Sequence, residues 1–362
     1  MSVVIDVSAA DSAQHRFGPS PLGELGAMLH ALAAPAHHRR LREWTEATSA
    51  RLPALLAEHL AEADFLWQVI RAAFLIPHTL CESLEEDLDA VDRIDDERFV
   101  AAALYTTCGT APPRPATSPL TDPTAREHAR ALARTRGPNQ AAFADWLLAD
   151  PPAVRIWLRQ LLQDCAGAFF HDAWQRVLPQ LRADARHKAD LAERRGLGAA
   201  LAAMSPAISL DATGQRIVVD KLQDVTTAVA PGLGVTFSPT AFGRPHVIVV
   251  HSPGWHPVIQ YPTQDPAAVP EPTSLELVRK RMEALAHPVR MRLARTLARG
   301  PHTTKELAAA WQLTTPEVSR HLATLKKCGL LVTQRQGRYV QHRFDLDASA
   351  RLSTDFLEAL LR

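Results

Sequence analysis

Small polar and basic side chains recur along residues 315–327 at the spacing of one helix face. An arginine can form a forked pair of hydrogen bonds with guanine or with a phosphate, and short polar side chains beside it let a helix approach closely. The pattern therefore predicts contacts with nucleic acid. The residues expected to make these contacts are Thr315, Pro316, Ser319, Arg320, His321, Thr324, Lys326 and Lys327.

The flanking segments carry further candidates for the same contacts. Thr303 and Thr304 begin a preceding short helix, while Arg335 and Arg338 lie on either side of a predicted turn. An arginine at the tip of a hairpin can reach backbone phosphates or a minor groove. The alternative is a helical packing module with a solvated basic face, because such faces are common. The combined pattern favours an interface with double-stranded DNA.

Capping patterns predict the elements that position these residues. Two capping boxes, at 303–306 and 314–317, have the spacing that opens a helix. Two short capped helices joined by a tight turn and followed by a hairpin are typical of a winged helix-turn-helix. The expected elements are helices at 275–287, 289–298, 304–311 and 315–327 and strands at 330–334 and 338–344.

Residues 282–344 resemble the winged helix-turn-helix of the arsenic-repressor (ArsR) family of bacterial regulators. The resemblance is carried by ALAHPVRMRLARTLARG, TTKELAAAW, TPEVSRHLATLKKCGLL and RQGRYVQHRFDL. It implies a dimer that binds an imperfect inverted repeat. It also implies that a helix beginning near residue 275 and a terminal helix form the dimer seam, through Leu275, Val278, Met282, Leu352, Phe356 and Leu360.

The segments that bind metals in that family lack suitable ligands here. Metal-sensing members carry Cys on the first helix of the motif, or Asp and His on the terminal helix. The corresponding segments, TTKELAAAWQL and DASARLSTDFLEALLR, contain neither Cys nor His, which zinc-like and softer metals require. We therefore expect no metal and no cofactor. Four scattered cysteines indicate buried thiols in a reducing compartment: Cys81, Cys108, Cys165 and Cys328.

The charge of the chain is unevenly distributed along its length. The formal net charge is only +1, but the residues from Thr273 onward carry +8 and the first 272 residues carry −7. Prolines concentrated between Ser252 and Thr273 predict a stiff spacer. The predicted organisation is an N-terminal region at 1–265, a proline-rich linker at 266–273 and a winged helix-turn-helix domain at 274–362.

The N-terminal region is expected to be helical over 15–205 and rich in strands over 208–262, so the predicted fold class is α+β. Amphipathic runs predict its helices at 21–34, 52–76, 84–91, 140–148 and 154–181. Short β-branched runs predict a small, mainly antiparallel sheet with a further strand at 3–7. Its segments HRFGPSPLGELGAMLHAL and SLEEDLDAVDRID resemble a domain that often precedes this winged helix in large bacterial regulators. That resemblance names no effector.

Two features of the N-terminal region could be mistaken for sites. Residues 82–97 contain nine carboxylates but lack the glycine and the final acid of a calcium loop, so a solvated acidic helix face is expected. His246, His251 and His256 are spaced by five residues, which fits neither one helix face nor strand alternation. They are expected to be surface or loop histidines.

These observations predict a DNA-binding transcriptional regulator, a dimeric repressor that reads an inverted repeat through the helix at 315–327 and the wing at 331–344. Its N-terminal region would respond to a non-metal small-molecule effector or a partner. The alternative is an enzyme or a protein-interaction module in residues 1–265 with a DNA-binding tail. No catalytic residue is expected, because motifs such as G-x-S-x-G, H-E-x-x-H and Walker A do not occur. Without an apolar span or a signal peptide, the expected location is cytoplasmic and nucleoid-associated.

Overall fold

The computed structural model describes residues 2–68, 71–109, 117–221, 224–252, 254–263, 274–336, 339–350 and 352–361. The chain divides into two compact units, residues 1–268 and 269–362. The predicted linker at 266–273 lies outside the described residues. Among the helices that the structure describes, none combines the length and the apolar composition needed to cross a membrane.

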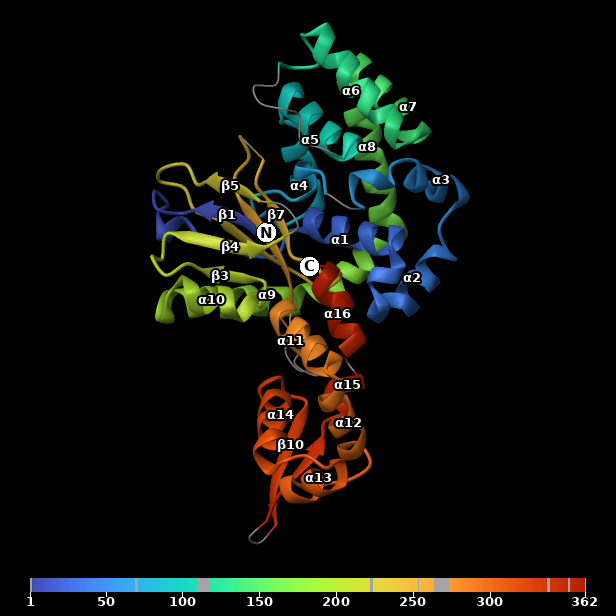
Figure 1. Ribbon diagram of the computed structural model, residues 1–362. Coiled ribbons are helices and arrows are strands. Elements are labelled where there is room, and N and C mark those ends of the chain that lie inside the picture. The colour runs from blue at the N-terminus through green and yellow to red at the C-terminus, as the bar shows by residue number, and fades with distance from the viewer. Residues whose placement is uncertain are drawn as a thin grey trace. The chain divides into compact units, whose positions relative to one another are not determined.

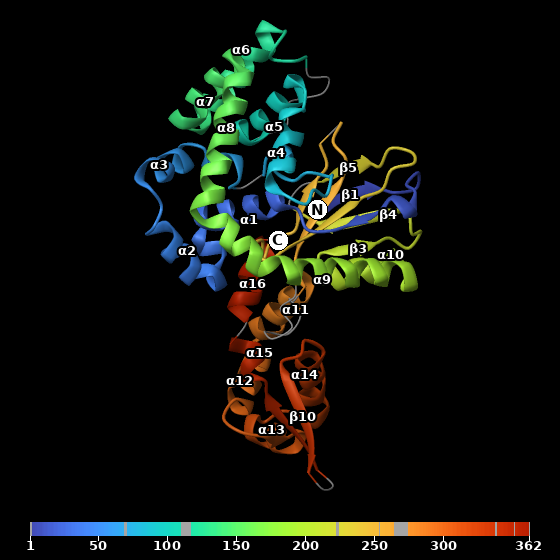
Figure 2. The ribbon, with the colours of Figure 1, turned by 180° about the vertical axis from the view of Figure 1, so that it is seen from behind.

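Helices make up most of the N-terminal unit. Its helices α2, α3, α6, α7 and α8 lie to one side and its strands to the other, with α10 alongside β3 (Figures 1 and 2). The helix bounds are α1 Pro21–Ala33, α2 Arg42–Ser49, α3 Ala54–Glu62, α4 Leu84–Asp92, α5 Asp96–Cys108, α6 Pro123–Arg136, α7 Pro138–Ala149, α8 Pro151–Cys165, α9 His171–Arg195 and α10 Leu197–Met204.

The strands of this unit form two mixed four-stranded sheets. In the order β3-β4-β1-β5, β1 is antiparallel to β4 and parallel to β5; in the order β2-β6-β8-β7, β6 is parallel to both β2 and β8. The prediction of one small, mainly antiparallel sheet is therefore wrong, because there are two sheets and both contain parallel pairs. The mostly helical α+β class is confirmed. The bounds are β1 Ser2–Asp6, β2 Arg16–Phe17, β3 Ile208–Leu210, β4 Arg216–Asp220, β5 Val225–Ala228, β6 Thr236–Thr240, β7 Ile248–Val250 and β8 Val258–Pro262.

Two apolar cores hold the N-terminal unit together. One lies among the helices and includes Trp67, Phe74 and Phe99; the other joins both sheets to α10 and includes Phe237 and Tyr261. Every residue of β6 and β8 is buried. Strands covered on both faces lose the alternating pattern that marks one-sided strands, which is why parallel pairing was not evident.

Several helical segments differ from the prediction. The amphipathic run at 52–76 forms α3 and then two short 3-10 turns, while the run at 154–181 is divided between α8 and α9 by a π-helical turn at Ala166–Phe170. Helices α2, α5, α6 and α10 were not predicted. In α5 the side chains of Phe99, Ala103 and Thr107 are buried, so much of its surface faces the core.

The acidic segment at 82–97 is not simply a solvated face. Its apolar stripe is buried as expected, but Glu85, Asp89 and Asp92 of α4 surround the guanidinium of Arg159 on α8 at 2.9, 2.9 and 2.5 Å. Asp87 is fully buried and accepts a hydrogen bond from the backbone N–H of Leu22 at the start of α1. Part of the segment therefore neutralises Arg159 and caps α1, although the three carboxylates around Arg159 remain partly exposed.

Replacing Arg159 with alanine should lower the free energy of unfolding by about 1 kcal/mol, because three carboxylates would lose their shared cation and repel one another. The effect is limited because the carboxylates are 37–59% exposed. Urea denaturation of the full-length protein measures it. Arg182→Ala, which removes a single exposed pair with Glu82, is the control and should change little. Equal midpoints for both variants would contradict the prediction.

The C-terminal unit is a winged helix-turn-helix, as predicted. Both capping boxes are formed: Thr303 with Glu306, and Thr314 with Glu317. A short strand, β9, was not predicted and pairs with β11 beside the hairpin. The bounds are α11 Leu275–Ala286, α12 Pro288–Leu297, β9 His302–Thr303, α13 Thr304–Trp311, α14 Thr315–Lys327, β10 Leu331–Gln336, β11 Tyr339–Phe344, α15 Leu346–Ala350 and α16 Leu352–Leu361.

Candidate nucleic-acid interface

Helix α14 is positioned by an apolar core beneath it. Val318, Leu322 and Leu325 are buried among side chains of α12, α13 and β10. Capping fixes the start of the helix, because the Thr314 hydroxyl accepts from the Glu317 N–H and the Glu317 carboxylate accepts from the Thr314 N–H. The Thr314 hydroxyl also donates to the Glu317 carboxylate, and this bond, together with the one from the Thr314 N–H, holds the pKa of the Glu317 carboxyl below its usual value. The cap and the core together fix which face of α14 points outward.

The outward face of α14 carries the predicted contact residues. Thr315, Pro316, Ser319 and Arg320 are exposed in the first turns, and Lys326 and Lys327 are exposed in the last turn. The backbone N–H groups at a helix start favour anions, and this is where the short side chains lie. The face can therefore present hydrogen-bond donors and positive charge to a polyanion.

Two other predicted residues of α14 are less available. The Thr324 hydroxyl donates to the backbone oxygen of Arg320 at 3.2 Å. His321 is half-buried, its ring centroid lies 4.9 Å from that of His287, and burial lowers its pKa. Thr303 and Thr304 are also partly buried. Thr303 caps α13, and the Thr304 hydroxyl contacts His342. These four residues hold the motif together as well as bordering the exposed face.

The wing is anchored to the helices by a histidine that sequence reasoning missed. His342 of β11 lies 3.3 Å from the Thr304 hydroxyl and 3.4 Å from the Thr333 hydroxyl. Arg335 is exposed on β10, whereas Arg338 lies outside the described residues. Arg343 is a second exposed cation of the hairpin. Strand alternation could have located it, because its neighbour Phe344 is buried.

The predicted dimer seam corresponds to two helices that contact each other, α11 and α16. Leu275, Met282 and Leu360 are 37, 38 and 47% exposed, so apolar side chains remain uncovered on both helices. Leu352 and Phe356 are half-buried. The assignment of Val278 to the dimer seam is wrong, because its side chain is 1% exposed and belongs to the core of the unit.

The prediction that His246 is a surface or loop histidine is half wrong. His246 does lie in a loop, between β6 and β7, but it is 9% exposed and its Nε2 is 3.2 Å from Nε2 of His30. His251 and His256 lie elsewhere: His251 contacts the Val249 backbone oxygen, and the ring of His256 lies 5.0 Å from that of His78 in a tilted arrangement. The three histidines do not form one group.

Comparisons with known proteins agree with the division of the chain into two parts. Residues 1–267 match a family of unknown function, DUF5937, and residues 285–335 match a helix-turn-helix domain. The biofilm growth-associated repressor of Agrobacterium fabrum is 37% identical over 71 residues, 20% of this chain and 61% of the repressor. The arsenic resistance transcriptional regulator ArsR1 of Pseudomonas putida is 39% identical over 62 residues, 17% of this chain and 48% of the regulator.

Similar solved structures cover a comparable fraction of the chain. A possible transcriptional regulator for arsenical resistance is 32% identical, with a TM-score of 0.20, over 21% of this chain and 80% of the other. The transcriptional repressor BigR from Xylella fastidiosa is 26% identical, with a TM-score of 0.20, over 22% of this chain and 82% of the other. The N-terminal match covers most of the chain, and the chain therefore belongs to the DUF5937 family of unknown function, with a helix-turn-helix domain of the ArsR type at its C-terminus.

Proposed function

We propose that this protein is a transcriptional regulator that binds double-stranded DNA through α14 and the β10–β11 wing. The observation that carries the proposal is the exposed polar and basic face of α14, held outward by its cap and its buried stripe. The charge of +8 on this part of the chain supports it. So do the relatives, whose names describe repressors and regulators. We further propose that the regulator resides in the cytoplasm, associates with the nucleoid and has no enzymatic activity.

The regulator would act as a homodimer and a repressor. Uncovered apolar side chains on α11 and α16 provide a surface that a second copy could bury. A twofold dimer would place two copies of α14 on two half-sites about one helical turn apart, so an inverted repeat is the expected target. An effector or partner of the N-terminal unit would then change the affinity for DNA, with a coupling of about 1–3 kcal/mol.

Arg320→Ala should weaken binding to the target sequence by about 1–3 kcal/mol, or roughly 5- to 150-fold, if Arg320 reads a base. The exposed position of Arg320 near the start of α14 is where a side chain can reach a base edge. The target is first selected from a random DNA pool with the full-length protein. Affinities of the wild type and the variant for that sequence and for single-position variants of it are then measured.

The matched control is Arg186→Ala, which removes the same charge from an exposed position on α9 of the N-terminal unit. It should leave affinity and specificity unchanged. If the selection yields no preferred sequence, or if Arg320→Ala binds all sequences as the wild type does, the proposal of a sequence-specific regulator fails.

A further inference from the structure

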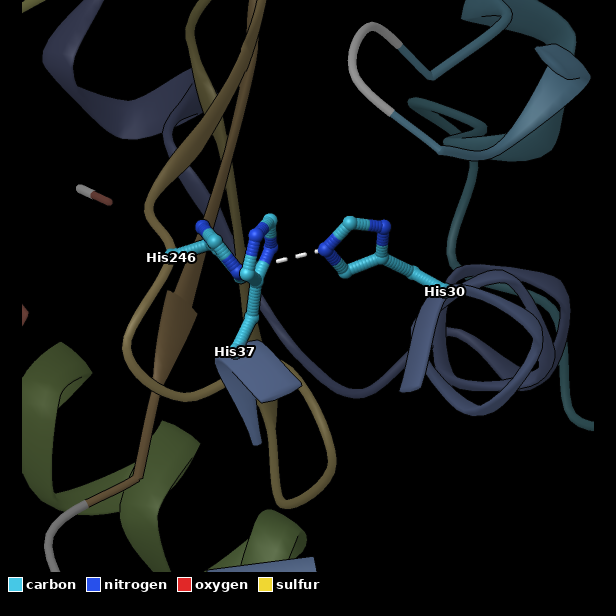
Figure 3. A group of neighbouring side chains, drawn as sticks. All are labelled: His30, His37 and His246. Atoms are coloured by element: carbon cyan, nitrogen blue, oxygen red, sulfur yellow. Dashed lines mark hydrogen bonds between the residues drawn. The ribbon is translucent and has the colours of Figure 1, made fainter. Parts of the chain in front are cut away.

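Four histidines from distant parts of the sequence converge in the N-terminal unit. His30 lies on α1, His37 and His38 follow in the turn after it, and His246 comes from the loop between β6 and β7. Ring centroids are 4.8 Å apart for His30 and His246, 5.0 Å for His30 and His38, and 5.7 Å for His37 and His246. Figure 3 shows the rings of His30, His37 and His246 directed toward one another. None of these contacts belongs to the nucleic-acid interface.

The tautomer of His30 leaves a lone pair directed into this group. Its Nδ1 is 2.9 Å from the backbone oxygen of Trp67, and a carbonyl can only accept, so Nδ1 carries the proton. Nε2 is therefore unprotonated, and His246 Nε2 must donate to it across 3.2 Å. A histidine that donates one ring nitrogen to a backbone carbonyl and presents the other is the usual arrangement of a metal ligand.

The distances suit a first-row transition metal. With metal–nitrogen bonds of about 2.0–2.1 Å, two imidazole nitrogens of a tetrahedral site lie about 3.3 Å apart, and the His30–His246 separation is already 3.2 Å. The candidate ligand nitrogens of His30, His37 and His246 all lie within 4.8 Å of one another. His37 is exposed, at the end of a short 3-10 turn, so rotation of its side chain can close the remaining distance.

The burial of His38 is a second observation that points to a ligand. His38 is 2% exposed, and apart from a weak contact with the Arg244 backbone its ring nitrogens make no hydrogen bond. Buried polar groups without partners are costly and uncommon in native proteins. Burial lowers the pKa of His30 to about 2 and that of His38 to about 4, with the Arg244 backbone partly opposing the shift at His38. Both rings are thus neutral at physiological pH, as ligands must be.

Two buried residues of opposite charge, Arg71 and Glu24, lie near the four histidines. The buried guanidinium of Arg71 lowers the pKa of His30 and of His38, and it would repel a bound cation. Buried Glu24 interacts with Arg71 and can balance it once ionised, although burial raises the pKa of Glu24 to about 7.

We infer that His30, His37 and His246 form a binding site for a divalent transition metal of the zinc class, with His38 positioned to complete or support it. Imidazole ligands suit Zn²⁺, Co²⁺ and Ni²⁺ better than Mg²⁺ or Ca²⁺, which prefer oxygen. The sequence predicted no metal in either part of the chain, and His246 was expected to be a surface or loop histidine, so this proposal departs from that prediction. Because the site belongs to the N-terminal unit, its existence can be tested without any measurement of DNA binding.

The test is a titration of the full-length, chelator-treated protein with Co²⁺, followed by visible absorption, and with Zn²⁺ in competition with a chromophoric chelator. We expect one tight equivalent per chain. His37→Ala should weaken it at least tenfold and should leave the fold intact because the side chain is exposed. His246→Gln is a second variant with the same expected loss. His187→Ala, an exposed histidine on α9, is the matched control and should bind as the wild type does.

Thermal unfolding provides an independent readout. A ligand that binds only the folded state raises the melting temperature, so Zn²⁺ should stabilise the wild type and His187→Ala more than His37→Ala. Absence of a tight equivalent in the wild type would overturn the proposal. Equal affinities of the wild type, His37→Ala and His246→Gln would also overturn it, because the metal would then bind elsewhere on the chain.

Discussion

Raising the salt concentration from about 50 to 200 mM should weaken binding to a selected DNA target by about 10³-fold or more, the loss typical of six to ten phosphate contacts. Arg320, Lys326, Lys327 and Arg335 are exposed, so the proposed dimer would present enough cations for that number. Each neutralised phosphate contributes about −0.9 to the slope of log K against log[salt]. Affinities measured across a salt series give this slope directly.

The two lysines at the end of α14 allow the same prediction to be tested by mutation. The double variant Lys326→Ala/Lys327→Ala removes four cations from a dimer and should flatten the slope by about 3–4 if all of them contact phosphates. The matched control, Arg186→Ala/Arg194→Ala, removes two exposed charges per chain from α9. A wild-type slope near zero, or an equal change in both double variants, would contradict a phosphate-binding role for this face.

Local signals made the C-terminal unit predictable. Thr303 and Thr314 stand three residues before Glu306 and Glu317, and each box forms as its spacing predicts because all of its hydrogen bonds lie within one turn. The same holds for the stripe of Val318, Leu322 and Leu325, whose spacing specifies one buried helix face. Exposure of Arg320 follows from that stripe.

Features that depend on contacts distant in sequence were not predictable. His30 and His246 are separated by more than two hundred residues, and no spacing rule relates them. Arg159 lies on α8, so its partners on α4 could not be recognised in a segment that seemed only acidic. Strand β1 pairs with β4 and β5, which lie more than two hundred residues later in the sequence. The sequence of β1 indicates a strand but specifies neither its partners nor its direction. Pairing emerges only when the cores assemble.

Arg281→Ala should destabilise the C-terminal unit by about 3–5 kcal/mol, the usual cost of removing one member of a buried ion pair. The Arg281 guanidinium, on α11, lies 2.9 Å from the Asp355 carboxylate on α16 and donates to the Cys328 backbone oxygen at 3.0 Å. Its side chain is 11% exposed and that of Asp355 is 15% exposed. The variant leaves a carboxylate and a carbonyl poorly solvated, and it loosens α16 from α11, where the dimer seam is proposed.

Hydrogen exchange of the full-length protein, followed by mass spectrometry, resolves this effect because it reports on each helix separately. Peptides from α11 and α16 should exchange about 100-fold faster or more in Arg281→Ala, since exchange through local opening follows the free energy of that opening. Arg279→Ala, whose side chain pairs with Glu276 and Glu283 on the solvent side of the same helix, should exchange as the wild type does. The double variant Arg281→Met/Asp355→Leu should recover part of the loss, because no charge is left buried without its partner. Equal protection of α16 in Arg281→Ala and Arg279→Ala would show that the ion pair does not hold the two helices together.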